Sequence, residues 1–123
     1  MTSTTSGLSE EFYDCAFDKM LERLKLESPT CSSFVGPGWV PVVEKCLTTL
    51  LEMGWNGKLS QIKEKFCTLR IYLYDYDERL EKIVEEAEKQ CESICESCGK
   101  ERKRVGPKTG SALCNACEKD YLK

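Results

Sequence analysis

The sequence has 123 residues, of which 41% are apolar and 32% are charged, a length and balance that suit one domain with a small appendage. No apolar run approaches the length of a membrane span, and a net charge of −3 argues against a protein covered by nucleic acid over its whole surface. Histidine is absent, so the commonest catalytic base is missing and any metal must be bound by sulfur or carboxylate.

The nine cysteines are many for a chain of this length. Their number is odd, the N-terminus has neither a basic nor an apolar signal-peptide region, and two pairs have metal-binding spacing. These features predict a reducing, cytoplasmic setting with four metal-bound thiolates and five free thiols. The alternative is a secreted protein held together by disulfides.

The first predicted element is a helix. Residues 1–8 are mostly small and polar and are predicted to form a disordered tail. Ser9 suits a helix N-cap, and apolar residues then recur at helical spacing, which predicts a helix from about residue 10 to residue 26. A loop rich in turn-forming residues follows, at 28–39.

A second helix is predicted at 41–53. Pro41 suits its first turn and Gly54 suits its C-terminal cap. Its apolar positions share one face, which we expect to be buried: Val42, Val43, Cys46, Leu47, Leu50 and Leu51.

A β-hairpin is predicted next, because apolar and polar residues alternate along 71–74. Residues 58–66 would form its first arm, although a helix competes for that arm, and the turn would lie near Cys67 and Thr68. One face of the second arm would carry aromatic side chains beside basic ones: Tyr72, Tyr74 and Tyr76 with Lys63, Lys65 and Arg70. This combination is typical of single-stranded nucleic-acid binding, but a sheet face half covered by a helix gives the same pattern.

A long amphipathic helix capped by Asp77 is predicted to follow, with a charged outer face. Its apolar face comprises Leu80, Ile83, Val84, Ala87, Cys91 and Ile94. The predicted fold class is therefore α+β, with a body at 9–94 and a metal module at 95–123. The apolar helix faces suit burial within one domain and would suit a homodimer equally well.

The four-cysteine motif is the strongest signal in the sequence. Cys95-x-x-Cys98 and Cys114-x-x-Cys117 are separated by fifteen residues, a spacing typical of structural Zn²⁺ sites. Gly99 follows the first pair, where the turn needs a positive φ. Four protein ligands leave no open position, so we expect a structural metal and no enzymatic activity.

A basic loop connects the two cysteine pairs. Four thiolates and one Zn²⁺ have a net charge of −2, which explains part of its positive charge. The same side chains form the candidate binding surface for phosphates: Lys100, Arg102, Lys103, Arg104 and Lys108.

Two catalytic alternatives exist. Cys91, Cys95 and Cys98 have the spacing of the iron–sulfur ligands in radical S-adenosylmethionine enzymes, but this chain is too short for the barrel of those enzymes. The carboxylates at positions 75, 77 and 78 could hold a divalent cation in a small nuclease, although helix capping explains two of them.

The C-terminal motif resembles known zinc fingers. "CESCG" followed by "LCNAC" is similar to a treble-clef finger, and residues 114–117 are similar to the second knuckle of GATA-type fingers. Such fingers bind DNA through the helix, the loop between the knuckles and a basic tail. Here the spacer is shorter, and the aromatic and basic loop signature and the tail are missing.

A broader resemblance covers residues 36–117. "GPGWVPVVEKCLTTLLEMG", "QIKEKFCTLRIYLYD" and a helix containing "EEAEKQCESICESCG" resemble a family of small bacteriophage proteins of unassigned function. In that family a Gly usually follows "KEKF" and the last ligand is often His, whereas this chain has Cys67 and Cys117 there. The resemblance implies an accessory role in the host cytoplasm. We therefore expect a zinc protein that binds a host protein or complex, with nucleic acid as the alternative partner.

Overall fold

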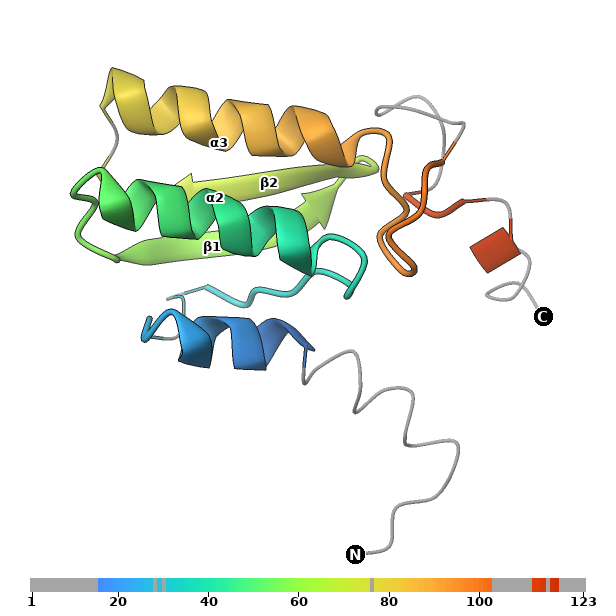
Figure 1. The fold of residues 1–123 in the computed structure, drawn as a ribbon, viewed down its shortest axis with the longest axis horizontal. Coiled ribbons are helices and arrows are strands. Elements are labelled where there is room, and N and C mark those ends of the chain that lie inside the picture. The colour runs from blue at the N-terminus through green and yellow to red at the C-terminus, as the bar shows by residue number, and fades with distance from the viewer. Residues whose placement is uncertain are drawn as a thin grey trace, which may run out of the picture.

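The computed structural model describes residues 16–27, 29, 31–75, 77–102, 112–114 and 116–117. An N-terminal helix (16–23) is followed by α2 (Val40–Glu52), β1 (Leu59–Lys65), β2 (Thr68–Leu73) and α3 (Glu78–Cys91) (Figure 1). The strands pair as an antiparallel hairpin, so the predicted α+β class is confirmed. Among the helices described, none is both long and apolar enough to cross a membrane.

The N-terminal helix packs against the body through its apolar face. Phe17, Met20 and Leu21 are buried, and the Phe17 ring meets Phe34 edge-on at a centroid distance of 6.0 Å. On its outer side, Arg23 makes a two-pronged salt bridge with Glu44 of α2. The predicted start of this helix, its cap at position 9 and the tail 1–8 lie outside the described residues.

Helix α2 lies within one residue of its predicted position at both ends. Pro41 occupies the first turn, as expected. Gly54 has a φ of +100° and donates its N–H to Leu51 O, while Trp55 N–H donates to Leu50 O. This pair of hydrogen bonds is a Schellman motif, which needs the glycine at this position.

Helix α3 is capped by the Asp77 carboxylate, which accepts the Leu80 N–H at 3.0 Å. Glu78 and Glu81 in the first turn and Lys89 in the last complement the helix dipole. Four of the predicted apolar positions are buried and two are partly buried: Leu80, Val84, Ala87, Cys91, and then Ile83 and Ile94.

The hairpin turn consists of Phe66 and Cys67, with φ values of +52° and +66°. Positive φ at both central residues is typical of a type I′ turn, whose twist matches that of the strands. The first arm is therefore a strand, and the turn lies one residue before the predicted position. Turns of this type favour Asn-Gly at their two central positions, so the Phe66-Cys67 pair did not indicate a turn in the sequence.

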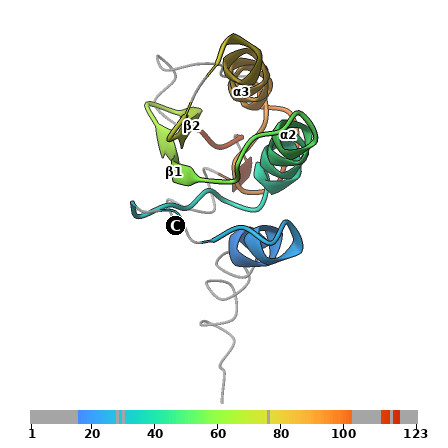
Figure 2. The same ribbon diagram turned by 90° about the vertical axis from the view of Figure 1, so that its left-hand side faces the viewer.

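Helices α2 and α3 lie on the same side of the hairpin, and α3 contacts both α2 and β2 (Figure 2). The core between the layers contains Val43 and Leu47 of α2 with Ile62, Leu69 and Ile71 of the strands, all at most 1% exposed. Burying side chains of this size contributes about 1.5–3 kcal/mol each.

Each strand of the hairpin has hydrogen-bonding partners on its outer edge. Along β1, Cys31 N–H donates to Ser60 O and Phe34 N–H to Ile62 O, so the segment 31–34 runs beside the strand. Along β2, the Glu88 carboxylate of α3 accepts the Ile71 N–H at 3.1 Å. Burial raises the pKa of Glu88, and this hydrogen bond opposes the shift.

Candidate metal centre

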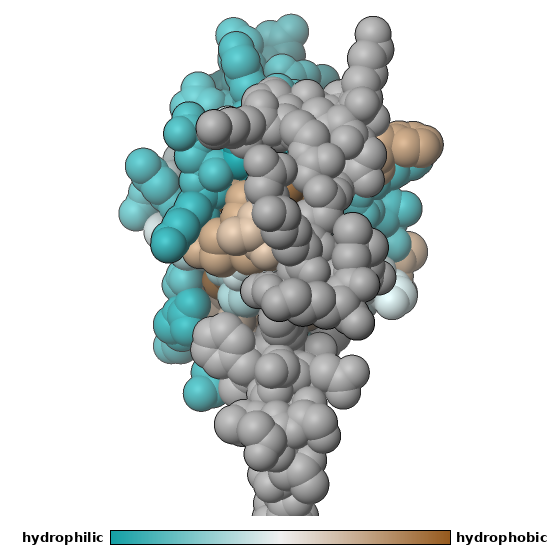
Figure 3. Space-filling view, turned by 90° about the vertical axis from the view of Figure 1, so that its right-hand side faces the viewer, coloured by the Kyte–Doolittle hydropathy of each residue, from teal (hydrophilic) through white to brown (hydrophobic). Residues whose placement is uncertain are grey.

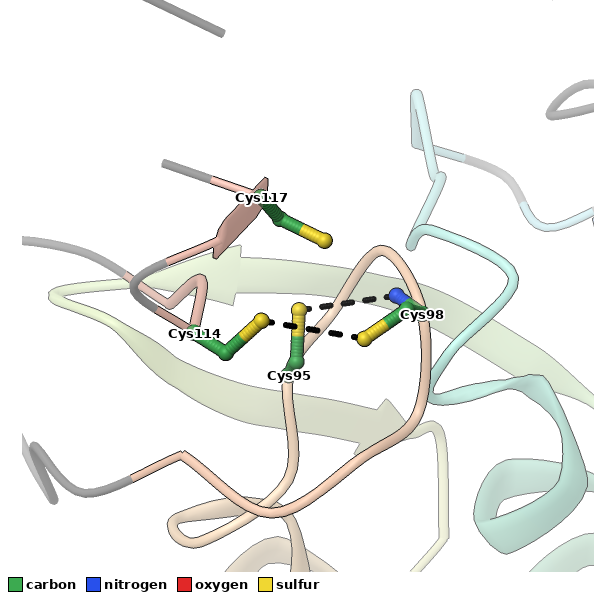
Figure 4. A group of neighbouring side chains, drawn as sticks. All are labelled: Cys95, Cys98, Cys114 and Cys117. Atoms are coloured by element: carbon green, nitrogen blue, oxygen red, sulfur yellow. Dashed lines mark hydrogen bonds between the residues drawn. The ribbon is translucent and has the colours of Figure 1, made fainter. Parts of the chain in front are cut away.

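The four predicted ligands converge. The sulfur atoms of Cys95, Cys98, Cys114 and Cys117 all lie within 4.8 Å of one another and point toward a common centre (Figure 4). Four sulfurs at about 2.3 Å from one tetrahedral ion would be about 3.8 Å apart. The Cys98 and Cys114 sulfurs are 3.8 Å apart. This set of atoms could hold a metal ion.

The first cysteine pair forms a tight knuckle. Cys98 N–H points at the Cys95 sulfur, with 3.5 Å between nitrogen and sulfur, and Gly99 N–H donates to Cys95 O at 3.0 Å. Gly99 has a φ of +81°, as its position after the pair predicted. Cys95 N–H then donates to Lys100 O, which closes the turn. The backbone therefore aims both sulfurs at one point.

The environment of Cys95 favours its thiolate. Burial opposes ionisation, but the backbone N–H groups of Ser97, Cys98 and Cys114 outweigh it and lower the pKa of Cys95 to about 7. Cys117 behaves in the opposite way, because burial and its three sulfur neighbours raise its pKa to about 12. Four sulfurs this close cannot all be negative unless a cation lies among them.

The knuckle is docked on the body by the segment 36–39, which was predicted only as part of a loop. Gly38 N–H donates to Glu96 O at 2.7 Å, and Gly36 N–H donates to the Glu96 carboxylate at 3.0 Å. The indole N–H of Trp39, whose side chain is buried, donates to Ile94 O at 2.8 Å. The "GPGW" motif thus forms the surface that receives the knuckle.

Glycine is required at this contact for steric reasons. A Cβ atom on Gly38 would lie 2.2 Å from Cys95 O and 2.5 Å from Gly99 N. A Cβ atom on Gly36 would lie 2.5 Å from Glu96 O. All three neighbours are backbone atoms, so a methyl group at either position forces the knuckle away from the body.

Arg102 corrects one sequence prediction. It was expected on the phosphate-facing surface, but its side chain is only 1% exposed. Its Nη2 donates to Cys67 O at 2.6 Å and to Cys91 O at 3.3 Å. These carbonyls belong to the hairpin turn and to the last residue of α3, where regular partners run out. Arg102 therefore joins the knuckle to two elements of the body.

The other predicted binding residues are only partly described. Lys100 is exposed, as expected, whereas Lys103, Arg104 and Lys108 lie outside the described residues. The second knuckle is represented by residues 112–114 and 116–117. It contacts the first through a hydrogen bond from Glu96 N–H to Ala112 O at 2.9 Å.

The alternative catalytic groups do not assemble in the part of the chain that the structure describes. Within the described ranges, the four cysteines are the one group of possible metal ligands close enough to share an ion, and Cys91 is not a member. Burial raises the pKa of Cys91 to about 12. Asp75 accepts a hydrogen bond from Asn56 at 3.3 Å, and Asp77 caps α3. Those two carboxylates thus have structural partners.

No protein-family model matches the sequence, and no curated protein and no solved structure matches the chain. The fold and the site together define a small α+β protein with a four-cysteine candidate metal centre.

Proposed function

We propose that this is a non-catalytic zinc protein in which one Zn²⁺ ion orders the two knuckles, and that it acts by binding a macromolecule stoichiometrically. The observation that carries the proposal is the convergence of four cysteine sulfurs within 4.8 Å, on a knuckle docked against the body. Zn²⁺ favours four thiolates in tetrahedral geometry, and such a closed site leaves no position for substrate.

The metal would stabilise more than its own loop. Arg102 lies between the two cysteine pairs in the sequence and contacts the hairpin turn and the end of α3. Ordering the knuckles therefore also orders these contacts. Metal binding by four cysteines contributes about 10 kcal/mol or more in small zinc domains, enough to support this arrangement.

The partner is proposed from the resemblance to small phage proteins, which favours a macromolecule of a bacterial host, such as a defence or gene-expression complex. DNA binding through the loop between the knuckles is a weaker candidate, because Arg102 is buried. The segment 77–98, which includes α3, is separately acidic, since it contains eight acidic and three basic side chains.

The test is metal analysis of the purified chain with matched cysteine variants. We expect one zinc per chain in the wild type and in Cys31→Ser, whose thiol is exposed and outside the cluster. Cys114→Ser should lose most of the zinc, and a chelator should lower the Tm of the wild type. Purified protein without metal, or the same Tm with and without chelator, would contradict the proposal.

A further inference from the structure

The hairpin has an outer face that no described element covers. The hairpin residues that pack into the core with the helices are buried, namely Leu59, Ile62, Leu69, Ile71 and Leu73, whereas most residues on the other side of the strands are half-buried or exposed. We call this other side, with the turn, the cationic face: Gln61, Lys63, Lys65, Phe66, Arg70 and Tyr72. Phe66 is 66% exposed and Tyr72 is 36% exposed. Tyr74, 54% exposed, follows directly after β2.

The charges on this face are of one sign. Lys63 lies directly opposite Arg70 in the register, and like charges in that arrangement destabilise a hairpin. Among the described residues, no carboxylate lies within ion-pair distance of Lys63, Lys65 or Arg70. Arg70 does lie near Glu88, but that carboxylate is already hydrogen-bonded to the Ile71 N–H. Lys63 and Lys65 therefore supply positive charge that no ion pair among the described residues neutralises.

The turn at the end of this face also has a backbone conformation that lowers the stability of the fold. Phe66 and Cys67 both have positive φ, a conformation that costs stability for residues other than glycine. The Cys67 backbone is held on both sides, by the Glu64 carboxylate at its N–H and by Arg102 at its carbonyl. The result is a phenylalanine displayed to solvent with the Lys65 ammonium 5.6 Å from its ring centroid.

Two costly features on one surface favour a binding role, because strained turns and unpaired like charges persist where function requires them. We propose that the cationic face binds single-stranded nucleic acid. Lys63, Lys65 and Arg70 contact the phosphates, and the exposed rings of Phe66 and Tyr72 stack on bases. The proposal rests on the proposed zinc site in one respect, since Arg102 of the ordered knuckle holds the turn.

Charge and composition favour this partner over an acidic protein. Lysine is depleted at protein–protein interfaces, whereas basic side chains interleaved with exposed aromatic rings are what unpaired bases and phosphates require. The path of the strand is also restricted. Arg70 and Tyr72 line a depression of about 320 Å³ together with Glu81, Glu85 and Glu88 of α3, so phosphates would run along β1 and the turn and would reach Arg70 from the side away from α3.

Figure 3 views the end of the molecule toward which the hairpin turn and the knuckle point. Among the residues coloured in that view, most are hydrophilic and a few apolar patches lie between them.

The experiment measures fluorescence anisotropy of labelled 12-nucleotide oligothymidylate and oligouridylate with the full, zinc-loaded chain at 50 and 200 mM KCl. Three phosphate contacts predict a salt slope of about −2, which is a roughly 20-fold loss of affinity over this range. Lys63→Glu should weaken binding about tenfold or more and yet raise the Tm, because it replaces a like-charge pair by Glu opposite Arg70. Phe66→Ala should weaken binding about tenfold.

The matched control is Lys45→Glu, which makes the same change in net charge on the exposed side of α2 and should bind like the wild type. Absence of salt-dependent binding, tighter binding of a duplex of equal length, or equal affinities of Lys63→Glu and Lys45→Glu would each overturn the inference. So would a host protein that is captured by the wild type and lost in Lys63→Glu while no oligonucleotide binds.

Failure of this inference and failure of the zinc proposal give different results. A zinc-loaded, folded chain that binds no oligonucleotide overturns the nucleic-acid surface alone. A chain that contains no zinc but binds oligonucleotide, with the expected loss in Lys63→Glu, overturns the zinc proposal and supports the surface. If the zinc proposal and the nucleic-acid proposal are both correct, removing the zinc with a chelator should weaken oligonucleotide binding several-fold, because Arg102 then no longer holds the turn.

Discussion

Gly38→Ala tests whether the docked knuckle is part of the folded body. Gly38 has no positive φ, so alanine meets no backbone strain there. The added methyl group instead meets Cys95 O, Gly99 N and Glu96 O at 2.2, 2.5 and 2.7 Å. Since all three are backbone atoms, they cannot move aside as a flexible side chain would.

The magnitude follows from two contributions. Overpacking of a close contact costs about 1–3 kcal/mol. Separation of the two backbones also breaks the 2.7 Å hydrogen bond from Gly38 N–H to Glu96 O, which contributes about 1 kcal/mol. We expect the free energy of unfolding to fall by about 3 kcal/mol, or about 150-fold in the equilibrium constant. Tm should fall by about 10 °C.

The assay is urea unfolding of the protein purified with zinc added, with Gly54→Ala as the matched control. Gly54 differs from Gly38 in both respects, because its φ is +100° and a Cβ atom there would meet nothing within 4 Å. Backbone strain alone should cost that variant about 1 kcal/mol. If Gly38→Ala is no more destabilising than Gly54→Ala, the knuckle is not held against the body and the steric reasoning fails.

Three further changes have predicted outcomes. Asp77→Ala removes the acceptor of the Leu80 N–H and should lower the free energy of unfolding by about 1 kcal/mol in urea melts, whereas Asp77→Asn should lose less. Phe66→Asn should raise it by about 1 kcal/mol, because asparagine tolerates positive φ, and should weaken oligonucleotide binding in anisotropy. Burial raises the pKa of Glu88, so the folded state binds this proton at a higher pH than the unfolded state. Its contribution to stability therefore increases as pH falls from 7 toward the ordinary glutamate range, and urea melts of Glu88→Gln should lack this increase.

The parts of the fold predicted well from sequence depend on local chemistry. Helix α3 combines a capping aspartate with an apolar stripe, and α2 combines an early proline with a terminal glycine, so each sequence specifies its own ends. The candidate metal centre is local in the same sense. Two residues between cysteines determine how one turn aims two sulfurs, and both pairs could be assigned before their distances were known.

The parts that sequence missed depend on contacts between distant residues. Nothing in "GPGW" indicates that Gly38 must meet a backbone 58 residues later, at Glu96, because glycine in a loop is usually explained by turn geometry. Arg102 was assigned to the surface because the neighbouring side chains are basic. Only the folded structure shows the two carbonyl groups that compensate its burial.

Arg102 gives a physical reason for the position of the four-cysteine cluster. Burying a guanidinium group costs free energy unless its N–H groups are hydrogen-bonded. The Nη2 atom of Arg102 donates to Cys67 O and to Cys91 O. Cys91 ends α3, where the helix dipole is negative, so a cation there is further stabilised. The Arg102 side chain reaches these two carbonyls from the knuckle, where the Arg102 backbone N–H donates to Ser93 O. Loss of the knuckle would remove Arg102 from both carbonyls, which would cost Cys67 O this buried donor and leave Cys91 O with the Ile94 N–H.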